Sequence, residues 1–228
     1  MAGVFASPRR PGYGREVPAL GTEIRLLGPM ELLVDGEPVE LGPTKQRAVL
    51  AMLALEANQV VSADRLMDGL WEERLPASAA KMVQHYIWQL RRALRNGADA
   101  EIATRGRGYE LRIDDARVDA RRFRTLLTAA AGGEQNGELA TALELWRGQP
   151  LEDVAGEPFA AVEIRRLEAL RLDALERAAE RELAEGRPRE ALARVDELLA
   201  ADRLRERAHA LGMLALYRAG RQSEALAA

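Results

Sequence analysis

The spacing of the apolar residues changes twice between residues 23 and 113 of this 228-residue chain. Short alternating segments come first, and the Asp35-Gly36 step between two of them is a strong hairpin signal. From Thr44 the apolar period lengthens to about 3.6 residues, which is typical of helices, and alternation returns after residue 100. The pattern predicts strands at 23–27, 31–34 and 38–41, helices beginning at 44 and after 62, a long helix at 77–95, and strands at 101–104 and 109–113.

The expected helices have recognisable ends and one clear buried face. Thr44 is expected to cap the first helix and Ser62 the second, because a hydroxyl can accept a hydrogen bond from a free backbone N–H of the first turn. In the long helix four apolar residues recur at helical spacing and predict the stripe that faces the core: Val83, Ile87, Leu90 and Leu94. Two short helices, a long helix and an arginine-tipped hairpin follow one another in the order of a winged helix. We therefore expect an α+β winged-helix domain over residues 23–115.

The second half of the chain has the composition of stacked helices, with alanine, leucine, arginine and glutamate throughout. Helices are expected at 119–131, 137–147, 158–185, 188–201 and 204–219, with another beginning at 222. Segments starting at Gly186 and Gly220 both read Gly-Arg, two residues, Glu-Ala-Leu, and this spacing is that of tetratricopeptide (TPR) repeats. The predicted fold class is mainly α: a winged helix followed by an all-α, TPR-like domain over 119–228, with two separate cores. Because another helix starts as the chain ends, we expect a fragment of a longer protein.

The composition excludes most catalytic and membrane chemistry. The chain has no cysteine and two histidines, which argues against thiol nucleophiles, Cys-ligated metals and most His-based sites. We expect neither an enzyme nor a cofactor, a metal or a small-molecule site. No apolar run approaches the roughly 20 residues that span a bilayer, so a cytoplasmic protein without membrane contact is expected. Residues 1–22 are rich in proline and glycine and are expected to form a disordered leader.

The long helix and the hairpin after it carry the strongest functional signal. The helix face opposite the buried stripe is polar, and residues 81–107 hold six basic side chains against two acidic ones. A basic helix suits the major groove of DNA, and arginines on a hairpin suit the adjacent minor groove. The candidate DNA-binding residues are Ser78, Lys81, His85, Trp88, Gln89, Arg92 and Arg95 on the helix or at its start, and Arg105 and Arg107 on the hairpin.

At three positions the sequence leaves two interpretations open. Lys45 and Arg47 begin the first helix, where they either contact DNA phosphates or form a solvated first turn. Trp88 either faces DNA or packs against the helical domain or a second copy. The formal net charge of −3 does not argue against DNA, because residues 1–118 hold 16 basic and 16 acidic side chains and the acidic excess belongs to the helical half.

Several segments resemble known families of regulators. Residues 102–111, Ile-Ala-Thr-Arg-Gly-Arg-Gly-Tyr-Glu-Leu, resemble the wing of OmpR/PhoB-type winged-helix domains, and residues 86–94 resemble their recognition helix. A narrower similarity is to the SARP family, the antibiotic regulatory transcription activators of actinobacteria. It is carried by residues 26–32, 41–50 and 60–66 in the first half and, in the bacterial transcriptional activation domain, by residues 145–148, 157–160 and 165–168.

The resemblance implies a sequence-specific, DNA-binding transcription activator. Such an activator is expected to bind direct repeats near the −35 promoter element, as two copies side by side on double-stranded DNA, and to contact RNA polymerase and its sigma factor. Its targets are expected to be secondary-metabolite (antibiotic) biosynthesis genes. The acidic loop with Glu72 and Glu73 is the candidate polymerase contact. The alternative is a TPR-type adaptor whose winged helix contacts protein rather than DNA.

Overall fold

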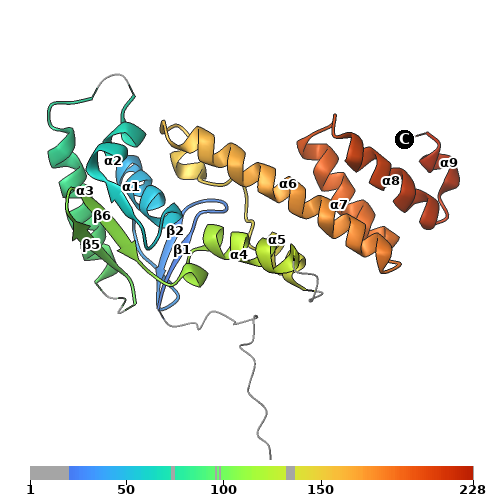
Figure 1. Cartoon of the computed structure of the whole chain (residues 1–228), viewed down its shortest axis with the longest axis horizontal. Helices are drawn as coiled ribbons and strands as arrows, with labels where there is room; N and C mark the ends of the chain where they lie inside the picture. Colours follow the sequence, from blue (N-terminus) through green and yellow to red (C-terminus); the bar gives the residue numbers. More distant parts are fainter. Residues whose placement is uncertain (1–20, 73–74, 96, 98, 132–136, 228) are drawn as a thin grey trace, which may run out of the picture.

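The computed structural model describes residues 21–72, 75–95, 97, 99–131 and 137–227. Its first half is a winged helix, in which a three-stranded antiparallel sheet precedes three helices and a second sheet of order β4-β6-β5 (Figure 1). The elements are β1 (Thr22–Arg25), β2 (Glu31–Val34), β3 (Glu37–Pro38), α1 (Thr44–Leu55), β4 (Val60–Ser62), α2 (Ala63–Leu70), α3 (Ala79–Leu94), β5 (Glu101–Arg105) and β6 (Gly108–Arg112).

The first described residues are part of the fold and not of a leader. Thr22 begins β1 and is fully buried. The amide of Gly21 donates to Asp35 Oδ1 at 2.7 Å, and the amide of Asp35 donates to the Gly21 carbonyl oxygen at 2.9 Å. Gly21 and Thr22 were therefore wrongly assigned to the expected leader of residues 1–22, and residues 1–20 lie outside the described residues.

Local sequence signals explain most of these elements. The Asp35-Gly36 turn joins β2 to β3 with φ values of 52° and 84°, the positive angles that this hairpin turn requires. Ser62 Oγ accepts from the amide of Arg65 at 3.1 Å, which confirms the predicted cap of α2. The expectation for α1 was wrong, because Pro43 occupies the N-cap position and no side chain caps the helix.

The packing centre of the first half is α1, in which every residue from Ala48 to Leu55 is buried. The four-residue stripe predicted for α3 is also buried, which confirms that one face of α3 is turned inward. Gly108 lets β4 and β6 come close together, because a Cβ at this position would lie 2.5 Å from the Val61 carbonyl oxygen. These contacts hold the β5–β6 wing and α3 in place. The face of α3 opposite the buried stripe is left exposed.

The second half is helical and extends away from the winged helix along α6 (Figure 1). Its helices are close to those predicted, although the second ends at Glu144 and the third begins at Ala160. A small core of Leu183, Val195 and Leu211 joins the last long helices. The elements are η1 (Asp115–Arg117), α4 (Asp119–Ala131), α5 (Glu138–Glu144), η2 (Glu152–Val154), α6 (Ala160–Ala184), α7 (Pro188–Ala201), α8 (Glu206–Arg218) and α9 (Gln222–Ala225).

The largest hydrophobic core is shared by the two halves, contrary to the expectation of separate cores. It runs continuously from Ile24 in β1, through α1, to Phe123 in α4 and Leu167 in α6. Backbone hydrogen bonds cross the same boundary, because the amides of Arg147 and Leu151 donate to carbonyl oxygens of the β1–β2 connection, each at 2.8 Å. The start of the helical half is therefore packed onto the winged helix, and the separate small cores join the second half of α6 to α7 and α8.

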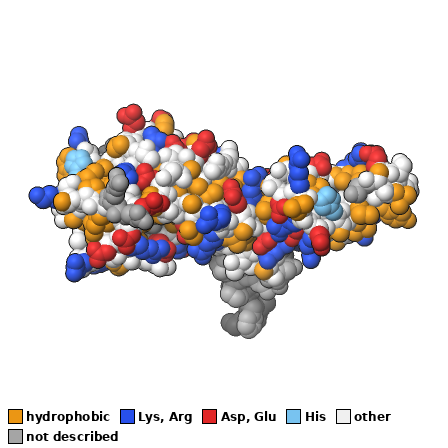
Figure 2. Space-filling model, turned by 90° about the horizontal axis from the view of Figure 1, so that it is seen from above, with side chains coloured by type: hydrophobic (Ala, Val, Ile, Leu, Met, Phe, Trp, Pro, Cys, Tyr) orange, Lys and Arg blue, Asp and Glu red, His pale blue; other side chains and the backbone are white. Residues whose placement is uncertain are grey.

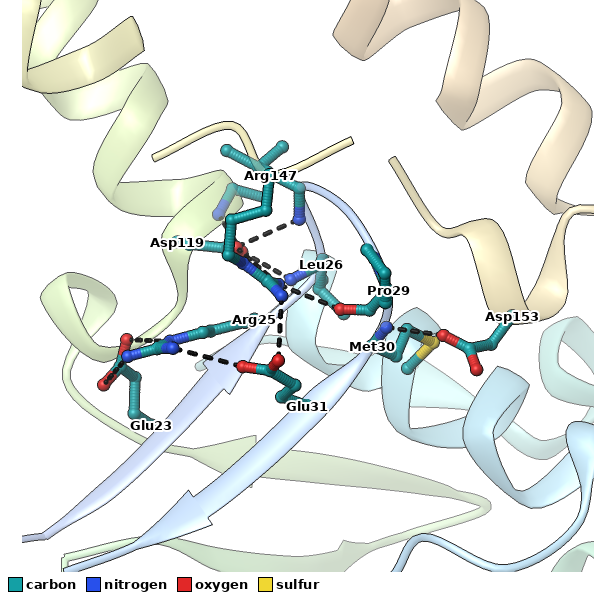
Figure 3. A network of polar contacts seen from close by, with 11 residues as sticks. Glu23, Arg25, Leu26, Pro29, Met30, Glu31, Asp119, Arg147 and Asp153 are labelled. Carbon is teal, nitrogen blue, oxygen red and sulfur yellow. Dashed lines mark hydrogen bonds and ion pairs between the residues drawn. The ribbon is translucent and has the colours of Figure 1, made fainter. Parts of the chain in front are cut away.

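A buried carboxylate stands at the centre of this boundary (Figure 3). Asp119, the first residue of α4, accepts from the amide of Leu26 at 2.7 Å and from that of Leu27 at 3.0 Å. Arg147 lies 3.9 Å from the same carboxylate and donates to the Pro29 carbonyl oxygen at 2.9 Å. Burial raises the pKa of Asp119 to about 6, although the backbone donors and Arg147 oppose the rise.

Removal of this carboxylate should destabilise the whole fold. In Asp119→Ala the amides of Leu26 and Leu27 would stay buried without an acceptor, so we expect the free energy of unfolding to fall by about 2–4 kcal/mol. Urea denaturation measures the loss. The control is Glu168→Ala, which removes an exposed carboxylate of α6 and should change stability by less than about 0.5 kcal/mol. A similar small effect at both positions would contradict the role of Asp119.

The raised pKa of Asp119 also predicts a pH dependence. Between the ordinary value of 3.8 and about 6, the unfolded chain has lost this proton while the folded chain keeps it. The contribution of Asp119 to stability should therefore fall as pH rises through this window, by roughly 3 kcal/mol in all. The measurement compares the wild type with Asp119→Asn, which cannot titrate, by urea denaturation at pH 4, 5, 6 and 7. The stability difference, wild type minus variant, should decrease with rising pH, and an increase would refute the assignment.

Candidate DNA-binding surface

The outer face of α3 brings together most of the residues predicted to bind DNA. Lys81, His85, Trp88, Arg92 and Arg95 are all exposed, and they lie opposite the buried stripe. The helix is at the left end of the molecule in Figure 1, far from α7, α8 and α9, and blue Lys and Arg side chains project from this end in Figure 2. The helix therefore offers a basic face that is exposed in the part of the chain that the structure describes.

Two other candidate residues lie at the border of this face. Ser78 is exposed and precedes α3, but its hydroxyl contacts the Met82 sulfur at 3.6 Å and does not cap the helix. Gln89 is half-buried, and its Nε2 lies 3.4 Å from His85 Nε2. Both side chains can be reached from the outer face of α3, with Gln89 the less exposed of the two.

Three side chains of the outer face contact one another. The rings of His85 and Trp88 are stacked, with centroids 6.1 Å apart and planes 28° apart. The Arg92 guanidinium carbon lies 5.8 Å from the Trp88 ring centroid. Trp88 itself is 50% exposed. In the described part of the chain Trp88 therefore contacts its own helix face and not the helical half, and DNA and a second copy both stay predictions for its partner.

The wing presents two arginines of different character. Both flank Gly106, whose φ of +54° makes the tight turn between β5 and β6. Arg105 pairs with Glu110 of β6 at 3.0 Å, so part of its charge is already neutralised. Arg107 is exposed, and its carbonyl oxygen accepts from the amide of Ala63 at 2.9 Å, which anchors the turn to the start of α2.

Arg91 has a structural role that the sequence did not reveal. Its Nε donates to the Ile102 carbonyl oxygen at 2.8 Å and its Nη2 to Thr104 Oγ1 at 2.7 Å, so it joins α3 to β5. In the sequence it counted only as one of six basic residues. Its place one turn after buried Ile87, at the edge of the stripe, is the signal that could have separated it from the outward-facing arginines.

Lys45 and Arg47 do not lie on the α3 face, and their first turn is not simply solvated, whereas contact with DNA phosphates stays a prediction. Lys45 Nζ donates to the Leu70 carbonyl oxygen at 2.7 Å and to Glu157 Oε2 at 3.0 Å. Arg47 donates to the Gly42 carbonyl oxygen at 3.0 Å and pairs with Asp153. Because the first turn of α1 faces the loops around η2, both cations join the winged helix to the helical half.

The remaining candidates can be placed only in part. Glu72 is exposed and follows α2, whereas Glu73 lies outside the described residues. Among the described residues, no cluster of His, Asp and Glu is arranged to hold a metal ion. The helices in the part of the chain that the structure describes are too short or too polar to cross a membrane.

A winged helix followed by a helical half is an arrangement found in transcriptional regulators, and comparisons with known proteins assign the chain to that class. Residues 36–111 match the family model described as "Transcriptional regulatory protein, C terminal", and residues 115–228 match the "Bacterial transcriptional activator domain". The chain belongs to the SARP family, as its sequence motifs predicted.

Individual relatives support this assignment over most of the chain. The chain is 36% identical to the regulatory protein DnrI of Streptomyces peucetius, over 90% of this chain and 81% of DnrI. It is 37% identical to the regulatory protein AfsR of Streptomyces coelicolor, over 96% of this chain but 23% of AfsR. The structure of Mycobacterium tuberculosis EmbR in complex with a low-affinity phosphopeptide superposes with a TM-score of 0.83 at 33% identity, over 90% of this chain and 57% of that one.

The position of Arg47 predicts a stability effect without a DNA effect. Arg47→Ala breaks the partly exposed ion pair with Asp153. We therefore expect the free energy of unfolding, measured by urea denaturation, to fall by about 1 kcal/mol. The salt dependence of binding to duplex DNA should stay unchanged, because the guanidinium is not on the α3 face. Fluorescence anisotropy between 50 and 200 mM salt measures it. If the plot of log affinity against log salt becomes shallower by about one unit, Arg47 contacts a DNA phosphate and this prediction is wrong.

Proposed function

We propose that this regulator binds double-stranded DNA with the outer face of α3 in the major groove and with the β5–β6 wing in the adjacent minor groove. The observation that carries the proposal is the outer face of α3, at the end of the molecule, along which Lys81, Arg92 and Arg95 are all exposed (Figure 1). An α-helix with its side chains, about 10–12 Å across, fits the major groove, which is about 12 Å wide.

The charges on this end suit a phosphate backbone. Among the described residues, no carboxylate forms an ion pair with Lys81, Arg92, Arg95 or Arg107. These cations can therefore pair with phosphates and release bound counterions, which is the main source of affinity that does not depend on sequence. His85 and Gln89 carry the hydrogen-bonding groups that can reach base edges.

The helical half supports a role in activation. Because it shares a core with the winged helix, DNA bound at α3 would hold α7, α8 and α9 in a defined position beside the promoter. The proposed activator binds direct repeats near the −35 element as a side-by-side pair and recruits RNA polymerase and its sigma factor, with Glu72 and Glu73 as candidate contacts. It works in the cytoplasm, without a cofactor, and its proposed targets are antibiotic biosynthesis genes.

Two arginine substitutions test the DNA contacts. Arg92→Ala and Arg107→Ala should each weaken binding and make the plot of log affinity against log salt shallower by about one unit, because each removes one phosphate contact. Fluorescence anisotropy with a labelled duplex measures both quantities. The control is Arg189→Ala, which removes an exposed arginine of α7 at the other end of the molecule and should leave the slope unchanged.

The same titration separates the activator from the protein-binding adaptor. The adaptor predicts no binding to random duplex DNA at low salt, and that result would overturn the proposed function. Where binding is found, selection of tight binders from a random pool supplies the operator sequence. Two similar half-sites in the same orientation would support the side-by-side pair on direct repeats.

A further inference from the structure

Trp88 brings an exposed apolar ring to the middle of a polar helix face. Successive residues of a helix are rotated by about 100°, which puts Trp88 within about 50° of the line opposite the buried stripe. Its neighbours on that face, Lys81, His85 and Arg92, are all polar. Half of the Trp88 surface stays in contact with water. A helix laid into a groove along this face would therefore bring one large apolar surface against the base edges.

The Trp88 ring is held in place before any ligand arrives. His85, three residues earlier, stacks on it, and Arg92, four residues later, has its guanidinium over it. Both contacts restrict rotation of the indole about its side-chain bonds. A restricted side chain loses less conformational entropy on binding, so its contacts contribute more of their energy to affinity and selectivity.

The chemistry of the major groove limits what an apolar ring can recognise there. Each base pair shows hydrogen-bond donors and acceptors, and the apolar group on the base edges is the 5-methyl of thymine. We propose that Trp88 is a specificity-determining residue that selects thymine at one position of each half-site by packing against this methyl group. The proposal rests on the proposed function, since it requires α3 to lie in the major groove.

The experiment changes only the methyl group. The probe is the duplex selected by the wild-type chain from a random pool, and each thymine of one half-site is replaced in turn by uracil, which has the same hydrogen-bonding groups. At one position the wild-type chain should bind the uracil duplex roughly three- to tenfold more weakly, the effect of losing one buried methyl contact. Trp88→Ala should bind the thymine duplex more weakly and show no difference between thymine and uracil at that position.

Two control variants separate methyl recognition from other effects. Lys81→Ala should weaken binding to both duplexes and keep the ratio between them. Val162→Ala, which trims an exposed apolar side chain on α6, should change neither affinity. Thermal melts of all variants should match the wild type, because each changed side chain is exposed.

Three results would overturn the inference. Uracil tolerated at every position by the wild-type chain would show that no thymine methyl is read. A thymine preference that persists in Trp88→Ala would assign the methyl contact to another residue. Both results leave DNA binding intact and so leave the proposed function standing. A wild-type chain that binds no duplex at low salt would overturn the proposed function as well.

Discussion

The hydrogen bonds from Leu26 and Leu27 to the Asp119 carboxylate determine how the two halves of this protein fit together. They fasten the end of β1 to the first turn of α4, at a depth where the carboxylate is 5% exposed. A buried carboxylate is costly unless its oxygens are satisfied, so this geometry tolerates little displacement. The helical half must therefore start in one place and in one direction.

The other contacts across the boundary depend on that start. Once α4 is fixed, Arg147 reaches the β1–β2 connection, and Asp153 accepts from the amide of Met30 at 2.5 Å (Figure 3). Lys45 can then reach Glu157. A shared core with polar contacts around it is stiffer than two domains joined by a linker. For the proposed DNA binding this matters, because a rigid connection would pass the orientation of α3 on DNA to the surfaces of α7, α8 and α9.

Local patterns were enough to predict the elements but not the boundary between the halves. The α3 stripe, the Asp35-Gly36 turn and the Ser62 cap depend on residues at most a few positions apart, so periodicity and side-chain chemistry reveal them. The ion pairs of Lys45 with Glu157 and of Arg47 with Asp153 join residues 112 and 106 positions apart. One sequence without relatives does not encode such pairings in any local pattern. From the sequence alone, a cation at the start of a helix is therefore predicted to be solvated, because its distant partner cannot be identified.

The same distinction applies to the charges that would meet DNA. The sequence counts six basic residues between 81 and 107 as equals, whereas the fold divides them into two groups. Arg91 is committed to β5 and Arg105 shares Glu110 with Arg112, so a phosphate would have to replace partners that these side chains already have. Lys81, Arg92, Arg95 and Arg107 have no carboxylate partner among the described residues, although the Arg92 guanidinium contacts the Trp88 ring. Affinity that does not depend on sequence should therefore come mainly from these four, whereas the uncharged groups between them, of which Trp88 is the largest, can add sequence preference.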